Sequence, residues 1–276
     1  MDAVKPVRSF KADSLNVHVY DSNIALGIAA SDFAARELVS AIQKNGSANL
    51  VLATGASQFA FLDAFKMDRS VDWSKITVFH LDEYKGMSDR HPASFRKYLR
   101  ERILNDVHPA NVHFLEGDSE NVGAEAARYE ALLKTHPIHV ACIGIGENGH
   151  IAFNDPAVAD FNDPRLVKVV DLDEACRRQQ LGEGWFKTLE EVPTQALSLT
   201  IPAIMNCNVI SCVVPDLRKA RAVWNTLHGP ISTACPASIL RKHPQTRLFL
   251  DPGSASLLPA KQSMSNRRQN GNQARS

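Results

Sequence analysis

The chain has 276 residues, of which 44% are hydrophobic and 22% charged, as in an ordinary globular protein with one large core. Its net charge is +1, and the last 25 residues hold four basic side chains without an acid, so the rest is slightly acidic and lacks a basic footprint for nucleic acid. No run approaches the roughly 18 apolar residues of a membrane span, and the beginning "MDAVKPVRSFKADS" lacks the apolar core of a signal peptide, so we expect a cytoplasmic protein without membrane contact.

Seven apolar runs have the length and composition of β-strands. In chain order they are "LNVHVY", "ANLVLAT", "KITVFHL", "NVHFLEG", "IHVACIGIG", "CNVISCVVP" and "TRLFLD". Helical patterns lie between most of them, over residues 24–44, 57–65, 93–105, 122–133 and 217–227. This alternation predicts an α/β fold with a doubly wound, mostly parallel sheet and helices on both faces, as in Rossmann-like proteins.

A single domain is expected over residues 1–251, since the sequence has no internal repeat and no linker before its end. Residues 252–276 form a polar, basic tail that we expect to be disordered. In a doubly wound sheet the ligand lies beyond the carboxyl ends of the strands, so polar clusters at those ends are candidate sites.

The first polar cluster is "VLATGAS", in which a strand runs into Thr54, Gly55, Ala56 and Ser57 before a helix. Free N–H groups at a helix start favour an anion, so this turn is a candidate phosphate cradle. It is neither a GxGxxG nor a Walker loop, which argues against a dinucleotide or a nucleoside triphosphate. An ordinary capping turn explains the same pattern equally well.

The second cluster is "HLDEYKG", where a strand ends on Asp82 and Glu83 ahead of a loop that contains glycine. Successive strand residues point to opposite faces, so we expect one acid to face a ligand and the other to pair elsewhere. A solvated acidic loop is the alternative.

The third cluster is "GIGENGHIAFNDP", residues 144–156, directly after the apolar run "HVACI". Its glycines let the backbone approach a ligand, and His150 can take and return protons near neutral pH. Asp155 could orient the imidazole if "IAFN" folds back as a turn. A capped structural histidine is the alternative.

Two basic residues follow later strands, Arg177 in "DEACRRQQ" and Lys219 in "VVPDLRKARAV". A lysine in the first turn of a helix is poorly placed for the helix dipole, so an anionic ligand would explain Lys219. Scattered basic residues on surface helices are the alternative.

Together these motifs resemble the glucosamine-6-phosphate deaminases (isomerases), which share a superfamily with the 6-phosphogluconolactonases. The resemblance runs from about Val17 to Asp251 and is most specific in "LDEYKGMSDRHPASF" and "GIGENGHIAFNDP". Lactonases typically read "DER" and "GHTASLFP" where this chain has "DEY" and "GHIAFNDP", and both differences favour the deaminases. The resemblance implies conversion of glucosamine 6-phosphate and water to fructose 6-phosphate and ammonia.

Roles for four residues follow from the same resemblance. It implies that Asp82 moves the proton between C1 and C2 of the opened sugar and that His150 opens the ring. Asp155 falls where the family usually has a glutamate that supports this histidine. Asn148 falls where many members have an aspartate and others an asparagine.

The resemblance also places the substrate phosphate on the turn of residues 54–57, with Arg177 and Lys219 as cationic partners. The chemistry proceeds by proton transfer, so neither a cofactor nor a metal is expected. The five cysteines are odd in number and form no CxxC pair, which fits buried free thiols. The expected partner is a small-molecule sugar phosphate, and a homo-oligomer is possible because some family members carry an allosteric phosphate site between subunits.

Two other functions stay open at this point. A lactonase would use His150 to activate water against a sugar lactone. A non-catalytic sugar-phosphate regulator would keep the phosphate turn without the catalytic residues. The presence of Asp82 and His150, and the absence of a DNA-binding segment before Leu15, count against the regulator.

Overall fold

An eight-stranded sheet forms the centre of the protein in the computed structural model, which describes residues 4–259. The strand order is β1-β2-β11-β10-β7-β3-β4-β6, and all neighbours are parallel except β1 and β2. The strands are β1 (Arg8–Ala12), β2 (Leu15–Val19), β3 (Ala48–Leu52), β4 (Ile76–His80), β6 (Asn111–Val112), β7 (Val140–Ile143), β10 (Val209–Val214) and β11 (Thr246–Leu250). The mostly parallel sheet expected from the sequence is confirmed.

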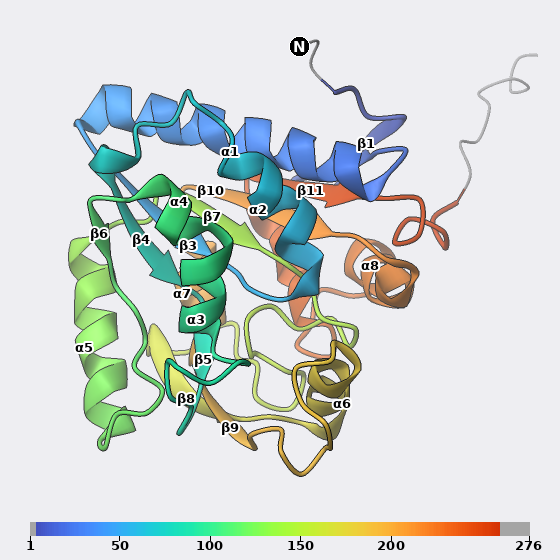
Figure 1. The fold of residues 1–276 in the computed structure, drawn as a ribbon. Coiled ribbons are helices and arrows are strands. Elements are labelled where there is room, and N and C mark those ends of the chain that lie inside the picture. Colours follow the sequence, from blue (N-terminus) through green and yellow to red (C-terminus); the bar gives the residue numbers. More distant parts are fainter. Residues whose placement is uncertain (1–3, 260–276) are drawn as a thin grey trace, which may run out of the picture.

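Helices cover both faces of this sheet (Figure 1). On one face lie α1 (Asn23–Asn45), α2 (Phe59–Phe65), α3 (Phe95–Leu99) and α4 (Asn105–Val107), with a π-helical turn over Arg100–Leu104 between the last two. On the other face lie α5 (Val122–Thr135), α7 (Ile201–Met205) and α8 (Ala220–His228). Along β3, Val51 and Leu52 belong to different hydrophobic cores, because neighbouring side chains of a strand point to opposite faces.

Local capping fixes the ends of the long helix α1. The Ser22 hydroxyl accepts a hydrogen bond from the Ala25 N–H at 3.2 Å, and the Gly46 N–H closes the other end by donating to the Ile42 carbonyl at 2.8 Å. Gly46 has a φ of 81°, which glycine adopts without the steric cost of a side chain. The following strand β3 therefore starts directly after the helix.

A second, three-stranded antiparallel sheet lies on the side of the molecule away from α1 (Figure 1). Its strand order is β5-β9-β8, with β5 (Asp82–Tyr84), β8 (Val167–Asp171) and β9 (Gln195–Leu199). Together with α6 (Glu174–Gly182) it encloses a separate small core that includes Tyr84 and Phe153. The sequence analysis did not predict this sheet, because β5 has only three residues and pairs with a strand more than a hundred residues later.

The folded chain extends beyond the domain end expected at residue 251. Leu258 is buried and belongs to the core on the α8 side of the sheet, and Ser254 is held by its backbone N–H, which donates to Asp251 Oδ1 at 2.8 Å. Residues 252–259 therefore pack on the domain, which corrects that part of the predicted disordered tail. The rest of the tail, from residue 260 on, lies outside the described residues.

No helix within residues 4–259 has both the length and the apolar character needed to cross a membrane.

Candidate active site

The candidate site is a cavity at the carboxyl edge of four adjacent strands, β10, β7, β3 and β4. The chain leaves β3 and β7 toward opposite sides of the sheet, and ligands of open α/β sheets bind at such a point. The space between its walls and in its open mouth amounts to about 550 Å³. The cavity brings together the predicted residues Thr54, Gly55, Ser57, Asp82, His150 and Lys219.

The turn after β3 forms one wall of the cavity. Gly55 has a φ of 94°, a conformation that strains any residue with a side chain, and its carbonyl accepts a hydrogen bond from the Tyr98 hydroxyl at 2.9 Å. A short 3₁₀ turn, Ala56–Gln58, then leads into α2. The backbone N–H of Ala56 points toward the Glu183 carboxylate, with N and Oε2 3.4 Å apart. The turn therefore presents a hydrogen-bond donor to an anionic group.

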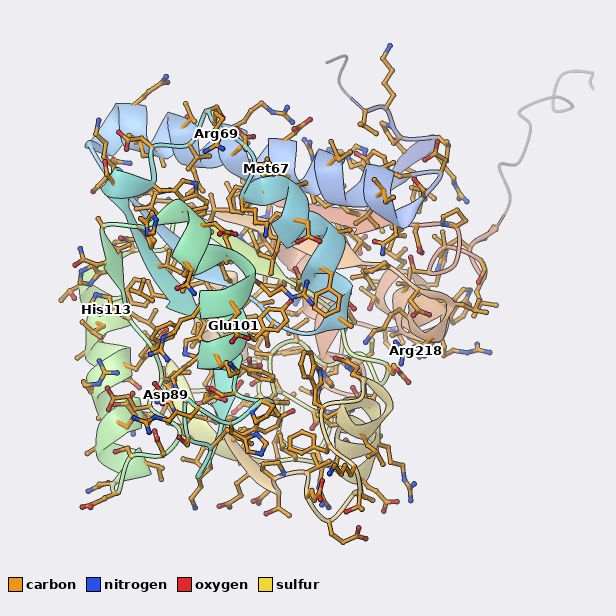
Figure 2. All side chains as sticks on the ribbon, in the orientation of Figure 1. Met67, Arg69, Asp89, Glu101, His113 and Arg218 are labelled. Carbon is orange, nitrogen blue, oxygen red and sulfur yellow. The ribbon has the colours of Figure 1, made fainter. Side chains whose placement is uncertain are left out.

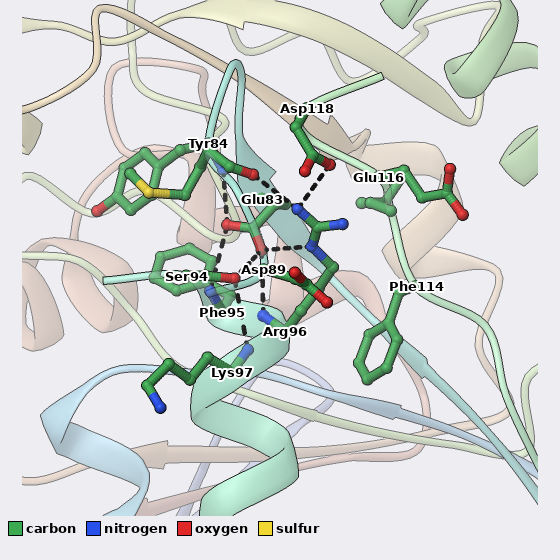
Figure 3. Close-up of polar contacts among 12 residues, drawn as sticks. Glu83, Tyr84, Asp89, Ser94, Phe95, Arg96, Lys97, Phe114, Glu116 and Asp118 are labelled. Atoms are coloured by element: carbon green, nitrogen blue, oxygen red, sulfur yellow. Dashed lines mark hydrogen bonds and ion pairs between the residues drawn. The ribbon is translucent and has the colours of Figure 1, made fainter. Parts of the chain in front are cut away.

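The two acids after β4 take different roles, and Figure 3 shows the contacts of the second one, Glu83. Asp82 lines the cavity, whereas the fully buried Glu83 turns the other way and accepts hydrogen bonds at the start of α3. Its donors are the Ser94 hydroxyl at 2.9 Å, the backbone N–H groups of Tyr84, Phe95 and Arg96 at 3.0, 3.2 and 3.1 Å, and Arg96 Nε at 3.3 Å. Burial raises the pKa of Glu83, and the hydrogen bonds from Arg96, Phe95 and Ser94 oppose this effect. The five donors make Glu83 a structural residue.

The environment of Asp82 favours its protonated form. Burial first, and then the neighbouring charge of Glu83, raises the pKa of Asp82 to about 8. A carboxyl group with such a pKa exchanges its proton near neutral pH, which an ordinary aspartate does not do. Only 7% of Asp82 is exposed, so it meets reactants only inside the cavity.

His150 is held flat against the backbone of the glycine-rich loop. A Cβ built on Gly146 would come within 2.2 to 2.4 Å of the imidazole ring, so only glycine leaves room for the ring there. Nδ1 of His150 lies 2.9 Å from Asp155 Oδ1, although the N–H is not aligned for a hydrogen bond, which leaves an electrostatic contact. With Nδ1 on the protein side, Nε2 is the nitrogen available to a ligand.

Asp155 and Asn148 lie behind His150, outside the cavity wall. Asn148 Nδ2 donates to Asp155 Oδ1 at 2.9 Å, its Oδ1 accepts from the His150 backbone N–H at 3.0 Å, and the Asp173 N–H donates to Asp155 Oδ2 at 3.3 Å. Burial alone would raise the pKa of Asp155, but the contacts with His150, Asn148 and Asp173 outweigh it and lower the pKa. Asp155 is therefore a buried carboxylate that supports the histidine, and Asn148 positions both.

Lys219 supplies the positive charge of the cavity. It ends a 3₁₀ turn, Leu217–Lys219, that follows β10, and only 3% of it is exposed. No carboxylate oxygen comes within the 4.0 Å of an ion pair with its ammonium in residues 4–259. Burial lowers the pKa of Lys219, and the charges of Glu183 and Glu147 oppose this effect. The neighbouring Arg218 points outward between α6 and α8 (Figure 2), where it pairs with Asp216 at 3.3 Å.

The structure does not bring Arg177 to the cavity. Its guanidinium donates to the backbone carbonyls of Leu189 and Val192 at 2.5 to 3.2 Å, which ties α6 to the segment that follows it. Arg178 pairs with Glu174 on the exposed side of the same helix. Neither arginine of "DEACRRQQ" therefore lies where a ligand of the cavity would meet it.

Sequence analysis missed the residues that α6 does contribute. Gln179, Gln180 and Glu183 line the cavity, and Cys176 lies behind them in the core. The spacing 176, 179, 180 and 183 is one face of a helix, whereas Arg177 is off that face. A polar stripe at helical spacing was the available signal.

Gln58, from the turn after β3, also lies in the cavity wall. It is 1% exposed, and neither of its amide atoms has a hydrogen-bond partner in the described part of the chain.

One group of potential metal ligands exists in residues 4–259, formed by His150, Asp155 and Cys176, whose ligand atoms lie within 4.8 Å of one another. Burial raises the pKa of the Cys176 thiol, and the Asp155 carboxylate beside it adds to the effect. A protonated thiol donates to Asp155 instead of binding a metal as a thiolate. We therefore describe this group as part of the hydrogen-bonded support of His150.

Comparison with known proteins gives one consistent result. Residues 21–249 match the family described as glucosamine-6-phosphate isomerases/6-phosphogluconolactonase. A glucosamine-6-phosphate deaminase of an Exiguobacterium species is 38% identical over 75% of this chain and 79% of its own length, and one of Listeria monocytogenes is 36% identical over 76% and 87%.

Solved structures agree with this assignment. A monomeric glucosamine-6-phosphate deaminase superimposes with a TM-score of 0.80 at 28% identity, covering 87% of this chain and 99% of its own. The 6-phosphogluconolactonase of Trypanosoma brucei superimposes with a TM-score of 0.72 at 17% identity, covering 88% and 98%, which shows the shared fold. Because the family match spans most of the chain and relatives are more than a third identical over three quarters of it, this protein belongs to the glucosamine-6-phosphate isomerase/6-phosphogluconolactonase family.

Proposed function

We propose that this protein is a glucosamine-6-phosphate deaminase, which converts glucosamine 6-phosphate and water to fructose 6-phosphate and ammonia in the breakdown of amino sugars. The observation that carries the proposal is the buried Asp82, which lines the same cavity as His150 and whose pKa is raised to about 8 by burial and by the charge of Glu83. A nearby cation favours the ionised form of a carboxyl group. The ammonium group of an amino sugar therefore turns Asp82 into a base when it binds, which a neutral sugar lactone would not do.

The first step opens the sugar ring, and His150 is placed for it. Its Nε2 takes the proton of the C1 hydroxyl and returns it to the ring oxygen as the C1–O5 bond breaks, so that an aldehyde forms at C1 and the imidazole ends unchanged. The 2.9 Å contact of Asp155 with Nδ1 orients the ring so that Nε2 faces the substrate. Asn148 holds Asp155 in that place through its 2.9 Å hydrogen bond.

The second step moves a proton between two carbon atoms. Asp82 takes the proton from C2 and returns it to C1, while one proton passes from the nitrogen on C2 to the oxygen on C1. The aldehyde and amine thereby become a hydroxyl at C1 and an imine at C2. Water then adds to C2, and ammonia leaves as the ketone forms, so the atoms balance with one water consumed for each ammonia released. The step proceeds by acid–base transfer through a side chain that the structure buries in the cavity.

The phosphate end of the substrate fits the opposite side of the cavity. Lys219 is a buried ammonium without an ion pair in the described residues, and the turn of residues 54–57 adds the Ser57 side chain and the Ala56 N–H. Arg177 is not part of this set. Lys219→Ala should weaken fructose 6-phosphate binding by about 1.5–3 kcal/mol, the range for a hydrogen bond to a charged group.

The test is an assay of the purified protein with glucosamine 6-phosphate that follows ammonia and fructose 6-phosphate together. Asp82→Asn keeps the shape but removes the base, so turnover should fall by about 10²- to 10⁴-fold while fructose 6-phosphate still binds. The matched control is Asp63→Asn, an exposed aspartate on α2. Hydrolysis of 6-phosphogluconolactone without release of ammonia from the amino sugar would refute the proposal in favour of a lactonase.

A further inference from the structure

The wall opposite the turn of residues 54–57 carries a carboxylate. Glu183 follows α6 directly, and its Oε2 lies 3.4 Å from the Ala56 backbone nitrogen. Gln179 Nε2 donates to Oε1 at 3.0 Å, and Trp185 Nε1 donates to Oε2 at 3.3 Å, so both oxygens have fixed partners. An anion of the protein itself thus faces the donors that we assign to the substrate phosphate.

The charge of Lys219 depends on the same carboxylate. Burial disfavours the ammonium, and Glu183 is the first of the acids that counteract this effect, followed by Glu147. Glu183 and Lys219 line the same cavity without forming an ion pair within the described residues, and the carboxylate charge favours the ammonium. Any anion that enters this end of the cavity competes with Glu183 for Lys219 and for the Ala56 N–H, and is repelled while Glu183 stays in place.

The backbone on both sides of Glu183 has open space around it. Gly182 and Gly184 flank it, and a Cβ built on either glycine would contact nothing within 4 Å. Gly184 has a φ of 83°, so the chain turns there in a conformation open to glycine. The two glycines are therefore not held by side-chain packing. The Glu183 N–H still donates to the Gln179 carbonyl at 3.0 Å, so a ligand that displaces the carboxylate has to replace its hydrogen bonds with Gln179 and Trp185.

We propose that Glu183 is a specificity-determining residue that occupies the phosphate end of the cavity and yields to a dianion but not to a monoanion. The inference rests on the proposed function, since it assigns that end to the substrate phosphate. A phosphate monoester carries about two negative charges near neutral pH and three acceptor oxygens. A monoanion that displaces the Glu183 carboxylate replaces one negative charge near Lys219 by another, so little binding free energy is gained. A dianion brings two negative charges and is attracted more strongly to Lys219. Glu183 thus acts against wrong ligands as a built-in competitor.

The experiment compares glucose 6-phosphate with glucose 6-sulfate, which have the same shape but differ by one charge and lack the amine. Their dissociation constants are measured from inhibition of glucosamine 6-phosphate deamination and from Trp185 fluorescence, since Trp185 loses its Glu183 partner when the carboxylate leaves. Wild type should favour the phosphate by at least about 30-fold. In Glu183→Gln the ratio of the two dissociation constants should fall about tenfold, mainly because glucose 6-sulfate binds more tightly.

The matched control is Glu174→Gln, which removes an exposed carboxylate at the start of the same helix and should leave the preference unchanged. Trp185→Phe should abolish the fluorescence signal but keep the inhibition. An unchanged preference in Glu183→Gln, with glucosamine 6-phosphate still deaminated by wild type, would overturn the role of Glu183 alone. Failure of wild type to bind any sugar phosphate would overturn this inference and the proposed function together.

Discussion

Replacing Asp82 by asparagine should stabilise the protein while it removes the catalytic base. In the folded protein burial, followed by the charge of Glu83, raises the pKa of Asp82 to about 8 from an ordinary 3.8. At pH values between these two pKa values, Asp82 is ionised in the unfolded chain but protonated in the folded protein. The stability that this proton contributes is therefore complete below pH 3.8 and is lost as the pH rises through about 8. Asparagine stays neutral and avoids the loss.

The magnitude follows from the same two pKa values. Each pH unit between them changes the free energy of unfolding of wild type by about 1.4 kcal/mol, so the three units from pH 5 to pH 8 correspond to about 4 kcal/mol. Water that enters the cavity when Asp82 ionises reduces this figure, and about 2–4 kcal/mol is expected. A change of this size is a large part of the stability of a typical domain.

Urea unfolding of wild type and Asp82→Asn at pH 5, 6, 7 and 8 measures the effect directly. The advantage of the variant should grow with pH, because all other titrating groups are common to both proteins. Asp63→Asn, at an exposed position, should differ from wild type by a small and constant amount. A difference between wild type and Asp82→Asn that stayed constant or shrank with pH would refute the argument from burial.

Three further variants test other parts of the structure. Glu83→Gln removes the buried carboxylate 3.3 Å from Arg96 Nε, while Asp118 still pairs with the same guanidinium at 2.8 Å. The free energy of unfolding in urea should fall by about 1.5–3 kcal/mol, the range for a hydrogen bond to a charged group, and a loss under about 1 kcal/mol would contradict the structural role of Glu83. Leu258→Ala should cost about 3 kcal/mol in the same assay, whereas an unchanged midpoint would restore the domain end at residue 251. His150→Gln should slow deamination of the cyclic sugar by about 10²- to 10⁴-fold and matter much less for an open-chain substrate. Equal losses on both substrates would exclude His150 from ring opening.

The central sheet was predictable because its strands are buried on both faces and read as continuous apolar runs, such as β7 with "VACI". The small sheet was not, since its pairing rests on contacts between distant segments and not on a local pattern. Asp82 pairs with Ser198 in β9, and nothing around Asp82 in the sequence points to that partner.

Only part of the candidate site was predictable from local sequence patterns. Strand pleating separates Asp82 from Glu83, as expected, but the choice between them depends on where α3 begins, since Ser94 and Arg96 hold Glu83. The resemblance to known deaminases made that choice from the sequence. Arg177 was placed by alignment alone, and the helical face of α6 instead turns Glu183 into the cavity.

The pairing of β5 with β9 also determines when during synthesis the protein can become active. Asp82 is made early, yet the strand that carries it is completed by Ala196, Leu197 and Ser198, more than a hundred residues later. Lys219 follows later still. A nascent chain whose residue 82 has left the ribosome before β9 is made therefore lacks the cavity. In such a chain Asp82 and Glu83 are exposed to water and not buried. Catalytic competence arises only when most of the chain has emerged, so an enzyme truncated before β9 is expected to be inert.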